Sequence, residues 1–249
     1  MLLDIKNISF GFTGNKQLLD NISFSLEQGS IYTLMGTNGS GKTTLFNLIS
    51  GFLKPQSGEI LFRGQNILHF PAYKINRLGI GRTFQDLRLV TKLSVKENIL
   101  LAMQNNPSDN WIKALMPSSV YKKELTALSD QADKIIKEYF LHDVKNSLAG
   151  EISFGQQKLL TLACCAANNS QCLLLDEPVS GIQPEYQHKI AEKLKQLKQQ
   201  GKTIFFIDHN TGFIADLADR IFFLHEGSLS LFNNITALRA DKSVVEAYL

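Results

Sequence analysis

The 249-residue sequence has no long apolar run and no recognisable secretion signal. None of its apolar segments reaches the roughly 18 residues that a membrane-spanning helix requires. The N-terminus, MLLDIKNISF, carries acid and amide residues where a signal peptide would have a basic start and a longer apolar stretch. We therefore expect a chain that stays in the cytosol and does not itself form a membrane pathway.

Cysteines and concentrated positive charge are also scarce. The three cysteines, Cys164, Cys165 and Cys172, are odd in number and lack metal-ligand spacing, which suits buried thiols in a reducing compartment. A net charge of +3 is too mild to indicate nucleic acid as a partner. The lysine-rich run from Lys189 to Lys202 lies with glutamines on one expected helix, and we interpret it as a solvated face.

The chain does contain alternating strand and helix signals. LLDIKNISFGF, LLDNISFSL and SGEILFRGQNIL are typical of exposed β-structure near the N-terminus. SIYTLM, QCLLLDEP and KTIFFIDH are short apolar runs typical of buried strands, and helical patterns follow the first two. Strands joined by such crossovers predict a parallel sheet, so we expect an α/β fold with an N-terminal antiparallel β subdomain.

Between Arg88 and Leu148 the strand signals fade and helical stretches such as SVKENILLAM take over. This segment is typical of a helical insertion in an α/β core. The tail RIFFLHEGSLSLF predicts a hairpin, and SVVEAYL predicts a closing helix. We expect one domain made of a core with its β subdomain, a helical subdomain and a C-terminal helix, at residues 1–87 with 158–235, 88–157, and 236–249.

GTNGSGKTT, Gly36–Thr44, fits the phosphate-loop pattern residue for residue. Glycines let successive N–H groups converge on a phosphate, and the following helix start adds partial positive charge. Lys42 is suited to reach the outer phosphates, and the Thr43 hydroxyl is suited to bind Mg²⁺. An ordinary glycine-rich turn is the alternative, but the strand before and the helix after favour a P-loop NTPase (RecA-like) core.

LLLDEP places Asp176 and Glu177 at the carboxyl end of a buried strand, where open α/β sheets bind ligands. Asp176 is suited to hold Mg²⁺, and Glu177 to polarise the water that attacks the terminal phosphorus. Two adjacent acids are in isolation equally consistent with surface charge. Their pairing with a phosphate loop favours the catalytic interpretation.

Two further stretches bear on the same chemistry. In ISFGQQK, Ser153 and Gly155 open a helix and offer a second anion site, although a simple N-cap is the alternative. His209 ends the TIFFIDH strand and leaves the sheet on the same side as Glu177, within reach of a γ-phosphate. A structural histidine is the alternative there.

These four stretches, in this order, resemble the ATP-binding subunit of an ABC transporter over almost the whole chain. The resemblance implies a Walker A motif, a Walker B motif, a signature motif and a switch histidine at Gly36–Thr44, Leu173–Glu177, Ile152–Gln156 and His209. It also implies that Gln85, in GRTFQD, is the Q-loop glutamine and that Phe12 stacks on adenine.

The resemblance further implies a role for each site residue. Catalysis would depend on Lys42, Gln85, Glu177 and His209. Mg²⁺ would be held by Thr43, Gln85 and Asp176. The residues expected to contact ATP in the same chain are Phe12, Gly36, Thr37, Asn38, Gly39, Ser40, Gly41, Lys42, Thr43 and Thr44. Those expected to contact the ATP of another subunit are Ser153, Phe154, Gly155 and Gln156.

One phosphate loop and one signature stretch per chain imply a head-to-tail dimer with two ATP molecules between the subunits. The second subunit would be identical or a paralogue, and ATP would drive association. The resemblance also implies membrane permease subunits as partners, no nucleic acid, and a place on the cytoplasmic face of the membrane. Residues that either form a groove for the permease or pack internally are Phe84, Leu87, Leu89 and Val90.

Within the family, GIGRTFQDLRLVTKLSVKENILLA and the ending VVEAYL are most similar to branched-chain amino-acid importer ATPases. A lipopolysaccharide-export ATPase and a soluble ABC ATPase acting on nucleic acid are the alternatives, as is a scaffold that binds ATP without turnover. Phe154 replaces a common signature glycine. Gln183 stands where many members carry an aspartate.

Overall fold

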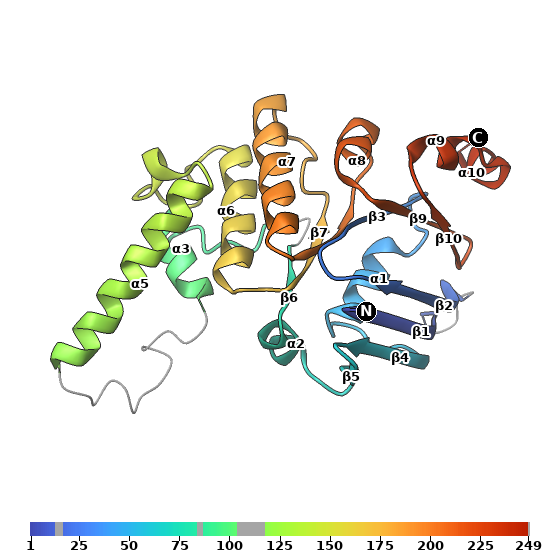
Figure 1. Cartoon of the computed structure of the whole chain (residues 1–249), viewed down its shortest axis with the longest axis horizontal. Coiled ribbons are helices and arrows are strands. Elements are labelled where there is room, and N and C mark those ends of the chain that lie inside the picture. Colours follow the sequence, from blue (N-terminus) through green and yellow to red (C-terminus); the bar gives the residue numbers. More distant parts are fainter. Residues whose placement is uncertain (13–16, 84–86, 104–117, 249) are drawn as a thin grey trace.

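The computed structural model describes residues 1–12, 17–83, 87–103 and 118–248 (Figure 1). Two residues with expected roles, Phe84 and Gln85, lie outside these ranges. No helix within these ranges is long and apolar enough to cross a membrane.

A six-stranded sheet forms the centre of the fold. Its order is β10-β9-β3-β8-β7-β6, with all neighbours parallel except β10, which pairs antiparallel with β9. Its strands are β3 (Ile31–Gly36), β6 (Ile80–Arg82), β7 (Cys172–Asp176), β8 (Thr203–Ile207), β9 (Arg220–His225) and β10 (Ser228–Phe232). The expected parallel core and C-terminal hairpin are confirmed.

A second, antiparallel sheet has the order β2-β1-β4-β5. Its strands are β1 (Leu3–Phe10), β2 (Leu19–Leu26), β4 (Ser57–Phe62) and β5 (Gln65–Asn66). In Figure 1 this sheet lies beside the parallel one, with α1 (Lys42–Ile49) next to it. The expected N-terminal β subdomain is therefore confirmed.

The remaining helices lie around the parallel sheet, and α5, α6 and α7 stand side by side (Figure 1). They are α2 (Ala72–Leu78), α3 (Val95–Ala102), α5 (Ser118–Glu138), α6 (Phe154–Ala167), α7 (Pro184–Gln199), α8 (Thr211–Leu217), α9 (Ile235–Ala240) and α10 (Lys242–Tyr248). Helical structure in the insertion is confirmed. Sequence reasoning missed α2 and β6, and it expected one C-terminal helix where α9 and α10 are two.

The buried strands divide their side chains between two apolar cores. Leu174 and Phe205 face a core shared with the antiparallel sheet and α1, whereas their neighbours Leu175 and Phe206 face a core shared with α3 and α5–α8. This division follows from the two-residue period of a strand. Because both faces of the parallel sheet are covered, its strands are continuously apolar in sequence.

The lysine-rich helix α7 departs from expectation at two positions: it ends at Gln199, so Lys202 lies beyond it, and Lys193 is buried. Lys193 is only 7% exposed, and its Nζ lies 5.5 Å from the centre of the Tyr139 ring. Lys195 and Lys198 instead form exposed ion pairs with Asp216 and Asp219. The prediction of a solvated face is therefore wrong for Lys193, because the helical insertion packs against that side of α7.

The three cysteines are free thiols in the core region, as expected. Cys165 and Cys172 are buried, and burial raises the pKa of each to about 12. Cys164 is partly buried and packs against the helical core. Since a thiol rather than a reactive thiolate is favoured at these sites, they serve packing.

Candidate active site

The glycine-rich loop joins the end of β3 at Gly36 to the start of α1 at Lys42. Gly36, Gly39 and Gly41 have φ angles of 150°, 80° and 106°, which L side chains rarely adopt. A Cβ added to Gly36 would lie 2.2 Å from the Leu224 carbonyl oxygen of the neighbouring strand β9. The pattern therefore needs glycine for both backbone conformation and space.

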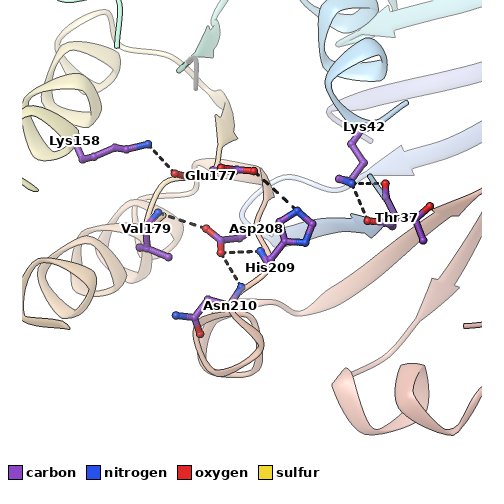
Figure 2. Close-up of polar contacts among 9 residues, drawn as sticks. Thr37, Lys42, Lys158, Glu177, Val179, Asp208, His209 and Asn210 are labelled. Carbon is purple, nitrogen blue, oxygen red and sulfur yellow. Dashed lines mark hydrogen bonds and ion pairs between the residues drawn. The ribbon is translucent and has the colours of Figure 1, made fainter. Parts of the chain in front are cut away.

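Lys42 is buried against this loop and points back into it (Figure 2). Its Nζ donates hydrogen bonds to the carbonyl oxygens of Gly36, at 2.7 Å, and Thr37, at 2.8 Å. Burial lowers the pKa of Lys42, while the nearby charges of Glu177 and Asp176 act in the opposite direction. The loop thus holds an ammonium group beside the two acids predicted to act with it.

The loop has the properties of a polyphosphate site. Helix α1 carries no acid in its first turn, so nothing there opposes the positive end of its dipole. The Ser40 hydroxyl is buried and, within the described ranges, has no hydrogen-bond partner. Thr43 is exposed at the first turn of α1. The residues present therefore fit a bound triphosphate.

Asp176 ends β7 with its carboxylate only 3% exposed. Burial raises its pKa, and the Arg82 guanidinium, 3.8 Å away, counteracts part of that rise. Its backbone N–H donates to the Thr83 hydroxyl at 3.1 Å. A buried carboxylate beside a phosphate loop fits Mg²⁺, which takes one or two protein carboxylates together with phosphate oxygens.

Arg82 also links α1, the helix after the glycine-rich loop, to strand β7, which carries Asp176. Its guanidinium donates to the Asn47 side-chain oxygen and the Ser50 hydroxyl on α1, both at 2.7 Å. Burial lowers the pKa of Arg82 to about 10. Sequence reasoning missed this residue, because an arginine in a three-residue strand carries no pattern.

Glu177 follows directly after β7 with φ at 49°, the left-handed region that costs a non-glycine residue about 1–2 kcal/mol. Two hydrogen bonds hold its peptide there. Its N–H donates to the Ile207 carbonyl at 2.9 Å, and its carbonyl accepts from Lys158 Nζ at 2.8 Å (Figure 2). The turn directs the carboxylate out of the strand toward His209.

His209 lies opposite Glu177, as the sequence predicted. Its Nε2 is 4.0 Å from Glu177 Oε1, and its side chain is 47% exposed. The turn is held by Asp208, whose carboxylate accepts from the backbone N–H groups of His209, Asn210 and Val179 (Figure 2). Asp208 was also missed, although it precedes the histidine in FIDH.

The signature segment begins α6 with a complete capping box. The Ser153 hydroxyl accepts from the Gln156 N–H at 3.3 Å, and the Gln156 side chain accepts from the Ser153 N–H at 2.9 Å. A Cβ on Gly155 would lie 2.5 Å from the Tyr186 ring, so this glycine makes room for α7. The N-cap interpretation is therefore correct locally, and Ser153 stays exposed.

The structure does not bring every expected site residue together. No hydrogen bond or ion pair in the described part of the chain joins residues 153–156 to the phosphate loop. Phe12 is 51% exposed, and its ring contacts the Phe10 ring edge-on, with ring centres 5.0 Å apart. Phe154 is exposed as well, with Lys158 Nζ 5.4 Å from its ring centre.

Comparison with known proteins decides the family. The ABC transporter family model matches residues 19–180. The chain belongs to the ABC transporter family. It is an ATP-binding subunit of an ABC transporter, and it is an ATPase.

The relatives of this ABC ATPase match it over its full length. It is 30% identical to the high-affinity branched-chain amino acid transport ATP-binding protein LivG of Escherichia coli K12, covering 100% of the chain and 97% of the relative. A probable LivG of Archaeoglobus fulgidus is 31% identical, with 100% and 95% covered. A solved nucleotide-free ATP-binding cassette of an ABC transporter superimposes with a TM-score of 0.84 at 29% identity, covering 100% and 98%.

Lys158 connects helix α6 to the turn after β7, because its Nζ donates to the Glu177 carbonyl. We expect Lys158→Met to lower kcat for ATP about tenfold and to change KM less than about twofold, since a hydrogen bond from a charged donor contributes about 1.5–3 kcal/mol. The physical reason is that the Glu177 peptide loses the bond that holds its left-handed turn. Steady-state ATPase assays measure both constants.

Lys158→Arg is the matched variant, because it keeps a long cationic donor and should recover most of kcat. Thermal unfolding of both variants checks that α6 still packs. A methionine variant that turns over ATP at the wild-type rate would show that Lys158 does not position Glu177.

Proposed function

We propose that this subunit powers the import of branched-chain or closely related amino acids through separate membrane subunits, from the cytoplasmic face. The observation that carries the proposal is full-length similarity, with more than nine-tenths of each chain covered, to subunits named for branched-chain amino acid transport. The names of these relatives do not favour lipopolysaccharide export or work on nucleic acid.

In the proposed mechanism the acids and bases at the carboxyl edge of the parallel sheet act on Mg·ATP. Glu177 orients the attacking water and accepts its proton, and His209, whose Nε2 lies 4.0 Å from the Glu177 carboxylate, contacts the terminal phosphate. Lys42 leaves its loop carbonyls to bind the outer phosphates. Asp176 and Thr43 would hold Mg²⁺. When bound, Mg²⁺ supplies neutralisation of phosphate charge.

The proposal includes a head-to-tail dimer. Ser153 is exposed at a helix N-terminus, yet no hydrogen bond or ion pair links it to the phosphate loop of its own chain in the described ranges. A second subunit turned head to tail would present its own signature segment, headed by Ser153, to this phosphate loop. The same arrangement would give the partner an equivalent site.

An uptake assay tests whether branched-chain amino acids are the transported substrate. The subunit, purified with the membrane subunits encoded beside its gene, is placed in proteoliposomes with ATP on the cytoplasmic side. We expect ATP-dependent uptake of radiolabelled leucine, isoleucine or valine supplied with a solute-binding protein. The same vesicles with Glu177→Gln should take up none. Active ATP hydrolysis without uptake of any of the three amino acids would refute the cargo assignment.

A further inference from the structure

A cavity of ≈ 230 Å³ lies between the helical insertion and the core, at the end of β7 opposite Asp176. Helices α5, α6 and α7, together with the start of β7, contribute its walls. About 10–15 Å³ of such space holds one water, so the cavity accommodates a molecule of several heavy atoms. None of the residues assigned to ATP lines it.

Two lysines, Lys193 and Lys202, line this cavity, and neither has an acidic partner among the residues that the structure describes. Lys193, 7% exposed, donates from Nζ to the Gln196 side-chain oxygen at 2.6 Å, and it forms no ion pair within the described ranges. Lys202 Nζ donates to the Asn169 side-chain oxygen at 3.0 Å and likewise has no carboxylate partner among the described residues. Lys193 is buried and Lys202 is partly buried, and two ammonium groups that line one cavity favour an anionic group supplied from outside.

The Tyr139 hydroxyl adds a neutral donor at the same place. Tyr139 lines the cavity and is 3% exposed, yet its hydroxyl takes part in no hydrogen bond with the described residues. The hydroxyl keeps contact with the solvent-accessible space, so it is available to donate to a ligand in the cavity. Lys193, Lys202 and Tyr139 together therefore match a carboxylate, which accepts several hydrogen bonds at once.

The rest of the lining determines which carboxylate fits. Glu138 is exposed at the edge of the cavity and forms no ion pair within the described part, so it is available to an ammonium group. The lining also includes an aliphatic wall made of Ile135, Ala166, Leu173 and Leu197. We propose that the cavity binds a small aliphatic amino acid, with its carboxylate at the lysines, its ammonium at Glu138 and its side chain on the aliphatic wall.

Direct contacts connect this cavity to the signature segment. Lys193 Nζ lies 5.4 Å from the centre of the Phe140 ring, and Lys189 Nζ lies 5.6 Å from the same ring. Lys189 Nζ is also 5.0 Å from the Tyr186 ring, whose hydroxyl is 3.5 Å from the Ser153 Oγ. A bound carboxylate would draw Lys193 away from the Phe140 ring and weaken the contacts that lead through Lys189 and Tyr186 to Ser153. We therefore expect the bound amino acid to change the rate of ATP turnover.

Calorimetric titration of the purified, full-length ATPase tests the site. We expect L-leucine to bind with a saturable heat. We expect 4-methylpentanoate, which lacks the ammonium group, and L-leucinamide, which lacks the carboxylate, to bind at least tenfold more weakly. No saturable heat for leucine up to millimolar concentration, or equal binding of 4-methylpentanoate or inorganic phosphate, would overturn the proposal.

Variants of residues that line the cavity test whether leucine binds there. Lys202→Gln and Glu138→Gln should each weaken leucine binding about tenfold, whereas Lys195→Gln, an exposed lysine on the same helix α7 that pairs with Asp216, should leave it unchanged. Unaltered affinity in both cavity variants would place the ligand elsewhere. Thermal unfolding verifies that each variant is folded.

The effect on turnover is measured in the same preparations. Saturating leucine should change the ATPase rate at least twofold in the wild type and in Lys195→Gln, but not in Lys202→Gln. Binding without any change in rate would refute the connection to Ser153. Because these experiments contain no membrane subunit, the absence of leucine binding or of a change in rate would not contradict the proposed import function. The absence of uptake in proteoliposomes likewise would not contradict the proposed amino-acid site in the cavity.

Discussion

Glu177→Gln leaves ATP binding intact and lowers ATP hydrolysis about a hundredfold or more. The amide has the shape of the carboxylate but does not accept a proton, so the attacking water would lose its proposed base. Losing one transition-state interaction of this kind costs a few kcal/mol, about a hundredfold or more in rate. The backbone bonds from Lys158 and to Ile207 are unaffected by the change. Release of radiolabelled phosphate measures the rate, and binding of a fluorescent ATP analogue measures the affinity.

Glu59→Gln is the matched control, because Glu59 is an exposed glutamate on β4 in the antiparallel sheet. We expect its ATPase activity to equal that of the wild type. The Glu177 variant should also accumulate as an ATP-bound dimer, since hydrolysis no longer separates the subunits. Near wild-type turnover by this variant would mean that another group acts as the base.

Ser153→Arg prevents ATP-dependent dimerisation while the monomer still binds ATP. An arginine at the exposed start of α6 adds bulk where the proposed partner triphosphate would sit, whereas the phosphate loop of the same chain keeps all its contacts. Gel filtration of the Glu177→Gln background, with and without Mg·ATP, measures the effect. We expect the dimer peak to disappear, and steady-state ATPase activity in the otherwise wild-type chain to fall at least tenfold.

Two further variants distinguish loss of the dimer contact of Ser153 from loss of its helix cap. Ser153→Asp keeps a good N-cap, which protects the roughly 1 kcal/mol that a cap contributes, but places negative charge against the partner's triphosphate. It should therefore be folded and monomeric. Ser228→Arg changes an exposed serine on β10 and should dimerise normally. A dimer that forms equally well with Ser153→Asp would refute the head-to-tail arrangement.

The elements that the sequence predicted well are those whose patterns are long or chemically constrained. The continuous apolar runs at β3, β7 and β8 predicted buried parallel strands because both faces of this sheet are covered. The phosphate loop was predictable because its glycines adopt backbone conformations that L side chains rarely adopt. The placement of His209 beside Glu177 followed from the two strands ending at one edge of the sheet.

The residues that sequence reasoning missed act through burial or through contacts distant in the chain. Lys193 is one of several lysines on α7, and its burial against Tyr139, the residue after α5, distinguishes it. Lys158 and Arg82 form hydrogen bonds to residues 19 or more positions away, which no local pattern reveals. Strand β6 has three residues, too few for a period to be visible.

Asp208 has a practical consequence for anyone who dissects this turn by mutagenesis. Its carboxylate alone accepts hydrogen bonds from three backbone N–H groups, so we expect the loop to keep its shape when the neighbouring imidazole is removed. A His209→Ala enzyme therefore reports on the loss of the imidazole alone. We expect an Asp208→Ala enzyme to lose activity for a different reason, because the backbone of the turn loses the acceptor of three hydrogen bonds.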